Sequence, residues 1–328
     1  RNGRDEVMLP GPVFRATLAW LVCRAGMAVP NPQTSATQRS TDPTFVIPVG
    51  GVARRYLVHA PPGWDGKRPL PVVVMLHGAG GSAWGATKET GWTAKADAAA
   101  FLAVFPEALP PDPSRPAQFL RNPQVWNDGS GRAHAGRRHI DDIGFIRAML
   151  DDLAARFPID GRQIFVTGFS NGASMTFRVG AELSDRVAAI APVSGHLWLQ
   201  SVILKRPVPM LYIIGTADPL NPLAGGEIPL PWGGVDRKAP IRDSILRWAR
   251  ASGCRTDPKT LRDSNGVTIL AYESPDHDTE VLFCTVEGLG HVWPGGKSLL
   301  PERIVGRRSD RFHATDAIWE FFQKHARR

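Results

Sequence analysis

The sequence Gly-Phe-Ser-Asn-Gly at residues 168–172 constrains the fold of this 328-residue chain more than any other feature. An apolar run at residues 163–167 precedes it and predicts a buried strand, and residues 173–177 have the pattern of a helix start. A serine between a strand and a helix, with glycine two places to either side, is typical of a nucleophile elbow, in which the serine backbone is strained and neighbouring backbone passes close by. The short pattern alone could arise by chance in a chain with 33 glycines, but the flanking elements favour Ser170 as a nucleophile.

Other apolar runs predict the rest of the sheet. Continuous apolar stretches predict strands covered on both faces, as in a parallel sheet, and helical patterns separate them. Glycines 50 and 51 lie between two extended segments and predict an N-terminal antiparallel hairpin. The expected class is α/β, a mostly parallel sheet with helices on both faces. The expected strands are 44–49, 52–60, 70–76, 101–105, 163–167, 187–193, 208–214, 267–272 and 280–286, and the expected helices include 92–100, 241–251 and 315–324.

The loop after strand 70–76 reads His-Gly-Ala-Gly-Gly and is the second chemical feature. Acyl transfer develops negative charge on a carbonyl oxygen, which preorganised backbone N–H groups stabilise. We expect the amides of Ala79 and Asn171 to form this oxyanion hole. A phosphate-binding loop is the alternative, but no Lys-Ser/Thr pair follows and the full G-x-G-x-x-G pattern is missing.

Asp218 and His291 are the candidates for the other two members of a catalytic triad. Asp218 follows the strand 208–214, His291 follows the last strand in a glycine-rich loop, and the order Ser, acid, His fits this type of site. Asp218 could instead be only a turn former before Pro219. His77 is better explained as a residue that shapes its loop, and His196 is the reserve histidine.

Two tryptophans are candidates for substrate contacts. Trp126 lies in a long segment, residues 106–139, that is rich in Pro, Gly and Arg, and loops of this length are usually functional. Trp126 could equally anchor the loop. Trp293 lies two residues after His291, and residues 220–240 are expected to form a flap over the site. Asp141 or Asp142 is expected to cap the next helix and not to take part in catalysis.

Composition excludes several other functions. The formal net charge is +8, but the basic residues are scattered and form no stripe with aromatics, so we expect no nucleic-acid partner. No apolar run reaches the ~18 residues of a membrane span. No His/Cys cluster has metal-ligand spacing, so we expect no metal and no other cofactor. Cys254 and Cys284 could pair if the protein is exported, although two free buried thiols are nearly as well supported.

The N-terminal residues 1–43 are expected to form a signal peptide and a flexible leader, followed by a single catalytic domain at residues 44–328. An apolar stretch at residues 16–23 with small residues beyond it is similar to a secretory signal. An ordinary N-terminal helix is the alternative. The expected location is therefore outside the cytoplasm, secreted or periplasmic.

Four motifs together resemble the bacterial polyhydroxybutyrate depolymerase-like esterases, which are related to the feruloyl and acetylxylan esterases of carbohydrate esterase family 1. The resemblance spans about residues 45–325 and implies the α/β-hydrolase fold and a serine esterase mechanism. The chain departs from the family where Ser274-Pro275 replaces a cysteine, which argues against a disulfide from Cys254. The motifs are His77-Gly78, residues 168–172, residues 215–219 and residues 290–295, with residues 141–145 as a weaker fifth.

The sequence thus predicts a carboxylic ester hydrolase that acts through an acyl-enzyme. Ser170 would attack, His291 would carry the proton and Asp218 would orient the imidazole. The expected partner is an ester, small or polymeric: a polyhydroxyalkanoate or a feruloyl or acetyl ester of plant polysaccharide. A peptidase or lactone hydrolase on the same scaffold is the alternative within enzymes, and a non-catalytic binding protein is the alternative outside them.

Overall fold

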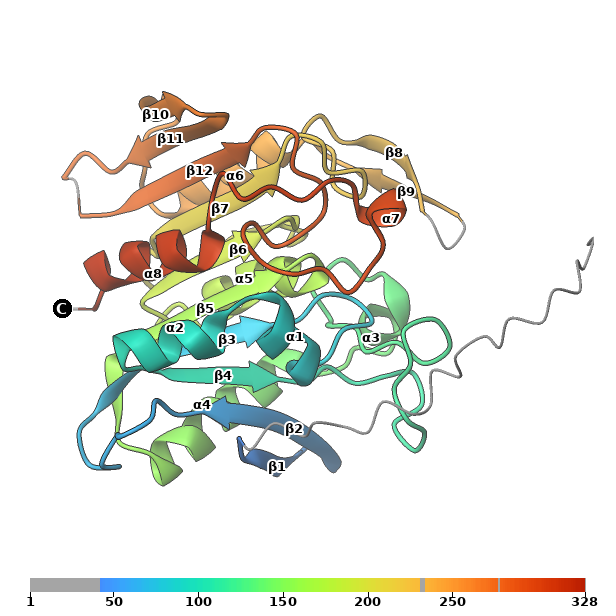
Figure 1. Ribbon diagram of the computed structural model, residues 1–328, viewed down its shortest axis with the longest axis vertical. Helices are drawn as coiled ribbons and strands as arrows, with labels where there is room; N and C mark the ends of the chain where they lie inside the picture. Colours follow the sequence, from blue (N-terminus) through green and yellow to red (C-terminus); the bar gives the residue numbers. More distant parts are fainter. Residues whose placement is uncertain (1–41, 231–233, 277, 328) are drawn as a thin grey trace, which may run out of the picture. The chain divides into compact units, whose positions relative to one another are not determined.

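The computed structural model describes residues 42–230, 234–276 and 278–327. The expected signal peptide and leader lie outside the described residues. The described residues form one compact unit by their internal contacts (Figure 1). No helix in the described part of the chain is long and apolar enough to cross a membrane.

One ten-stranded sheet organises this unit, and the α/β-hydrolase class predicted from sequence is confirmed (Figure 1). Its central strands pair in parallel, while β1 with β2 forms the predicted antiparallel hairpin at one edge and β11 and β10 add antiparallel strands at the other. In spatial order the strands are β1 (Thr44–Val49), β2 (Val52–His59), β4 (Leu102–Pro106), β3 (Leu70–Leu76), β5 (Ile159–Phe169), β6 (Ala189–Val193), β7 (Met210–Gly215), β12 (Glu280–Val286), β11 (Val267–Glu273) and β10 (Lys259–Ser264).

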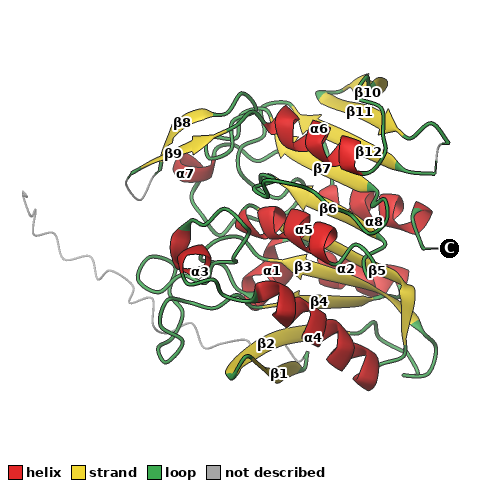
Figure 2. Cartoon of the chain, turned by 180° about the vertical axis from the view of Figure 1, so that it is seen from behind, coloured by secondary structure: helices red, strands yellow, loops and turns green. Residues whose placement is uncertain are grey.

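Helices cover both faces of the sheet, which is why its central strands are apolar along their whole length. Helices α4 (Asp142–Arg156), α5 (Asn171–Glu182) and α6 (Ile241–Ala251) lie on one face (Figure 2). Helices α1 (Ala83–Glu89), α2 (Trp92–Ala99) and α8 (Ala314–Lys324) lie on the other (Figure 1). Two apolar cores result, one on each side of the sheet.

The strand order places a crevice beside β3 and β5. The chain runs from β3 outward to β4, and then returns to β5 and continues in the opposite direction through β6 and β7. The loops that leave β3 and β5 at their carboxyl ends therefore diverge, and open α/β sheets bind ligands at such a point. Both the His-Gly loop and the Ser170 turn leave the sheet here.

Several surface elements were not predicted from sequence. Strand β10 carries mostly exposed side chains, so it lacks the apolar pattern on which the prediction depended. Its signal was the Asn265-Gly266 turn into β11, where both residues have positive φ angles. The expected flap contains a separate two-stranded ribbon, β8 (Gly226–Pro229) and β9 (Val235–Lys238). The short helix α3 (Ala133–Arg137) lies in the long segment 106–139 that was expected to be a loop, and the short helix α7 (Glu302–Val305) lies where no element was predicted.

Cys254 and Cys284 are free buried thiols. The sequence left open a disulfide between them or two free buried thiols, and the structure has the free thiols. Burial raises the pKa of Cys254 to about 11 and that of Cys284 to about 12. Neither thiol is poised for chemistry in the native state.

Candidate active site

Ser170 occupies a strained turn between β5 and α5. Its φ of 56° and ψ of −117° lie outside the regions that a non-glycine residue usually adopts. The flanking glycines allow the turn to pack: a Cβ at Gly172 would lie 2.1 Å from the carbonyl oxygen of Leu76, and one at Gly168 would lie 2.4 Å from the carbonyl oxygen of Gly172. The glycines are thus required by close backbone approach, and the turn projects Ser170 above the sheet.

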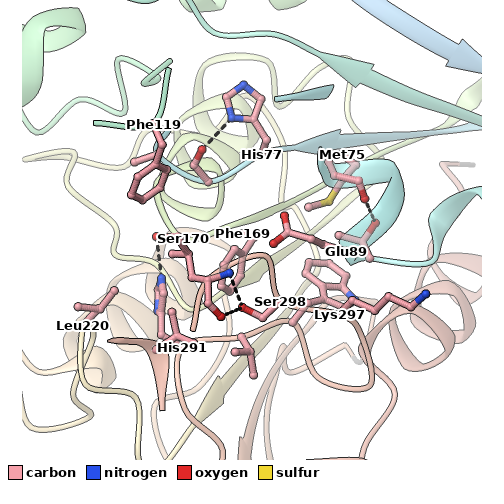
Figure 3. Close-up of a pocket in the computed structure, with 18 residues that line it drawn as sticks. Met75, His77, Glu89, Phe119, Phe169, Ser170, Leu220, His291, Lys297 and Ser298 are labelled. Atoms are coloured by element: carbon pink, nitrogen blue, oxygen red, sulfur yellow. Dashed lines mark hydrogen bonds between the residues drawn. The ribbon is translucent and has the colours of Figure 1, made fainter. Parts of the chain in front are cut away.

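Three side chains far apart in sequence form one hydrogen-bonded line. The Nε2 atom of His291 lies 2.9 Å from Oγ of Ser170 (Figure 3), and its Nδ1 atom lies 2.8 Å from Oδ2 of Asp218. These residues follow β12, β5 and β7 respectively, at the carboxyl ends of the strands. The structure brings together all three residues that the sequence nominated, while His196 lies outside this line.

Asp218 is held in its orientation by the turn that follows it. Its Oδ1 atom accepts the backbone N–H groups of Leu220 at 2.9 Å and Asn221 at 2.7 Å, which leaves Oδ2 for His291. Burial acts to raise the pKa of Asp218, but His291 and the two amides outweigh it, so the pKa lies below its ordinary value. An ionised carboxylate in this position can orient the imidazole and stabilise its protonated form.

The two residues whose amides are predicted to form the oxyanion hole line the same cavity as Ser170. The loop after β3 uses other amides for its own structure: Gly80 donates to the carbonyl of Gln124 and Gly81 donates to that of Gly78. Among the described residues, no hydrogen bond occupies the N–H of Ala79, and Asn171 is the first residue of α5, where an N–H has no intrahelical acceptor. Their role in holding an oxyanion stays a prediction.

His77 shapes the loop that carries Ala79. Its ring is buried, with Nδ1 2.8 Å from the carbonyl oxygen of Gly78 and Nε2 accepting the N–H of Ala108 at 3.2 Å. Burial lowers the pKa of His77 to about 4, so the ring is neutral near pH 7. This environment agrees with the structural role inferred from sequence.

Trp126 anchors the long loop to the elbow. Its side chain is 1% exposed, and the indole N–H donates to the carbonyl of His77 at 3.0 Å. Its backbone N–H donates to Oδ1 of Asn171 at 2.8 Å, and Nδ2 of Asn171 donates to Asp128 at 3.0 Å. These contacts favour the anchoring alternative for Trp126, although the residue also lines a cavity; a substrate contact stays a prediction.

The two aspartates at the start of α4 have different roles, only one of which the sequence identified. Asp141 is the N-cap, and its side chain accepts the N–H of Gly144 at 2.7 Å. Asp142 is instead fully buried and forms an ion pair with Arg54 at 2.6 Å, and its second oxygen accepts the N–H of Asn127 at 2.7 Å. The pair connects β2 to the loop that contains Trp126. No local pattern could have revealed a partner 88 residues away.

Two cavities meet at Ser170. The larger cavity has a volume of about 560 Å³, and Asn171 and Trp126 are among the residues that line it. The smaller cavity has a volume of about 80 Å³ and is lined by His291 (Figure 3) and Trp293, among others. Trp293 is nearly buried, and its indole N–H donates to Thr315 at 2.9 Å, so its substrate contact also stays a prediction. The residues that border both cavities are Ala79, Phe119, Ser170 and Leu220. Within residues 42–230, 234–276 and 278–327, no group of three His, Cys, Asp or Glu side chains could hold a metal ion.

Comparison with known proteins supplies the family. The profile described as phospholipase/carboxylesterase matches residues 65–228, which is half of the chain and includes Ser170 and Asp218. The chain belongs to this family. Both activities in that description hydrolyse esters, so membership places the chain among the ester hydrolases. His291 lies beyond the matched residues and is connected to the site by the geometry.

Individual relatives of this ester hydrolase carry related names. It is 28% identical over 95% of its length to NocK of Nocardia uniformis subsp. tsuyamanensis, a protein named as an esterase, and covers 90% of that protein. It is 28% identical over 74% of its length to feruloyl esterase B of Piromyces equi, of which it spans only 44%. The acetyl xylan esterase of Aspergillus awamori superposes with a TM-score of 0.56 over 86% of this chain and 99% of that one, at 15% identity, and therefore shares the fold.

Proposed function

We propose that the protein is a serine esterase that cleaves carboxylic esters through an acyl-enzyme. The observation that carries the proposal is the line from Ser170 Oγ through His291 to Asp218, at 2.9 and 2.8 Å. These are the distances over which a base can remove a proton from a nucleophile while a carboxylate holds the base in the required tautomer.

The proposed reaction has two halves. Oγ of Ser170 attacks the ester carbonyl as its proton moves to Nε2 of His291, and the carbonyl oxygen becomes an anion that the amides of Ala79 and Asn171 stabilise. The intermediate then expels the alcohol, which takes the proton from His291, and the acyl group remains on Ser170. Water attacks this ester in the same way, which releases the acid and restores the serine.

The two cavities suggest where each half of the ester binds. The departing alcohol oxygen must lie near Nε2 of His291, and His291 lines the smaller cavity. The acyl group would then extend into the larger cavity, whose apolar and aromatic wall includes Phe119, Val125 and Trp198. A volume of about 560 Å³ suits a bulky acyl group, such as a cinnamoyl group or a hydroxyalkanoate oligomer, more closely than acetate.

Replacement of the nucleophile tests the mechanism. We expect Ser170→Ala to lower kcat for p-nitrophenyl acetate by roughly 10⁴-fold or more, with an unchanged melting temperature. A fluorophosphonate should label the native protein and not the variant. Ser201→Ala, at an exposed position, is the matched control and should behave as wild type. Near-full activity of Ser170→Ala would refute the proposal.

The substrate class needs its own experiment. We propose feruloyl or acetyl esters of plant polysaccharide and polyhydroxyalkanoate oligomers, and we expect methyl ferulate to be hydrolysed faster than acetylated xylan because of the size of the larger cavity. Peptide and lactone substrates measured beside them test the alternative activities. Hydrolysis of a peptide with a higher kcat/KM than any of these esters would favour a peptidase.

We also propose that the protein acts outside the cytoplasm, as a catalytic domain at residues 44–328 released from an N-terminal signal. The basis is the apolar stretch at residues 16–23. Expression of the chain in a bacterial host, followed by fractionation and N-terminal sequencing of the mature protein, tests this. Cytoplasmic retention with an intact N-terminus would contradict it.

A further inference from the structure

A lysine with a buried side chain donates hydrogen bonds to the turn that carries the proposed catalytic acid. Lys238 is the last residue of β9 in the two-stranded ribbon, and its side chain is only 8% exposed. Its ammonium group donates to the carbonyl oxygen of Leu220 at 2.6 Å and to Oδ1 of Asn221 at 2.7 Å. These two residues are the ones whose backbone N–H groups hold Asp218.

We infer that Lys238 is a positioning residue for the acid of the triad: it fixes the 218–221 turn and supplies a positive charge beside Asp218. The inference rests on the proposed esterase mechanism. It assigns a role to a residue of the flap that lies 20 positions from the acid and outside the matched family segment, which ends at residue 228.

The side chain of Asn221 makes further contacts that fix the 218–221 turn. This residue is buried, and its side-chain NH₂ donates to the carbonyl oxygen of Ser194 at 2.6 Å, while its side-chain oxygen accepts from Lys238. The side chain of Asn221 is therefore fixed between the loop after β6 and the ribbon. Loss of Lys238 would leave two oxygen atoms without their donor and allow the turn to relax, together with the amides that orient Asp218.

The charges around Lys238 make its ammonium an electrostatic component of the site. Asp236 on the same strand lies 3.5 Å from Nζ and also pairs with Arg132, which precedes α3. His196, after β6, has a pKa lowered to about 3, chiefly by burial, and is neutral. Burial lowers the pKa of Lys238, while Asp236 and Asp218 act in the opposite direction. Glu89 and Lys297 line the smaller cavity together with His291.

A kinetic readout separates a positioning role from general support of the fold. Asp218 orients His291 only while the 218–221 turn keeps its shape, so a loosened turn should lower kcat and leave KM close to the wild-type value. A variant that keeps an N–H donor at residue 238 should restore part of kcat, which a purely structural role of Lys238 would not require.

Direct contact with the substrate is the competing role, because Lys238 also lines the larger cavity. The two roles separate by substrate size. An acetyl group is too short to fill the larger cavity, whereas a feruloyl group extends along it. A positioning residue affects kcat for both substrates, and a substrate-binding residue affects mainly KM for the longer one.

The experiment compares Lys238→Met, which removes the charge and the donors, with Lys238→Gln, which keeps an N–H donor. For p-nitrophenyl acetate and methyl ferulate alike, we expect Lys238→Met to lower kcat roughly 10- to 100-fold, the cost of a misplaced catalytic group. Lys238→Gln should retain more of kcat than Lys238→Met for both substrates. Lys205→Met, which removes an exposed lysine paired with Asp185, is the matched control and should leave kcat for both substrates unchanged.

The outcomes are distinguishable from failure of the proposed mechanism. If Ser170→Ala is inactive and yet both Lys238 variants retain the wild-type kcat, the positioning role is wrong and the esterase mechanism stands. A defect confined to KM for methyl ferulate would also overturn the positioning role in favour of substrate contact. If Lys238→Met does not fold, Lys238→Gln decides the question: a lower kcat with an unchanged KM for both substrates supports the positioning role, and a wild-type kcat overturns it.

Discussion

The buried ion pair between Arg54 and Asp142 offers a quantitative test of the structure. Arg54 is 2% exposed and Asp142 is 0% exposed, and the guanidinium also lies 4.0 Å from the ring centroid of Phe145. Asp142→Ala removes the carboxylate and leaves the Arg54 charge in the core. It also removes the acceptor for the N–H of Asn127.

The expected cost follows from the uncompensated charge. Breaking a buried ion pair by removal of one partner destabilises a protein by about 3–5 kcal/mol, whereas replacing both partners with apolar residues is often neutral. At about 2–4 °C per kcal/mol for large domains, Asp142→Ala should lower Tm by roughly 6–20 °C. The double variant Arg54→Met/Asp142→Leu should recover most of this loss, because no charge is then left without a partner.

Urea unfolding followed by circular dichroism measures the free energy of unfolding for each variant. Asp141→Ala is the matched control, because it removes the adjacent carboxylate, whose contact is the exposed N-cap bond to Gly144, and should cost only about 1 kcal/mol. If Asp142→Ala costs no more than Asp141→Ala, the buried charge of Arg54 does not depend on Asp142 for compensation. A double variant that is less stable than Asp142→Ala would contradict the uncompensated charge as the cause of the loss.

Two further predictions concern the elbow and the thiols. Gly172→Ala should lower both kcat and Tm, because its Cβ would lie 2.1 Å from the carbonyl oxygen of Leu76. Gly161 has open space around it, so Gly161→Ala is the control and should be close to neutral in the same assays. Equal effects of the two substitutions would contradict the close approach at Gly172. Burial raises the pKa of Cys254 to about 11 and that of Cys284 to about 12. Both thiols should therefore resist a thiol reagent such as dithionitrobenzoate at mildly alkaline pH until the protein unfolds. Rapid modification of either thiol in the native state, detected by mass spectrometry, would show that it is accessible.

The sequence was most informative where chemistry and periodicity coincide locally. The apolar runs located the central strands, because a strand buried on both faces must be apolar along its length. Strand β3 at Leu70–Leu76 and helix α6 at Ile241–Ala251 begin and end at the predicted residues. The edge strand β10 and the ribbon of β8 and β9 were missed because their exposed side chains carry no such pattern.

Within the candidate site, too, local sequence predicted some features and missed others. The sequence alone nominated Ser170, Asp218 and His291, because each follows a strand and their order along the chain fits one type of site, and it identified the glycines that the elbow needs. Only the tertiary structure decided that these three side chains lie within hydrogen-bond distance, that Trp126 is an anchor, and that Asp142 and Lys238 have buried partners. The physical reason is that strands and tight turns depend on neighbouring residues, whereas a buried charge is stabilised by groups that folding brings from distant parts of the chain.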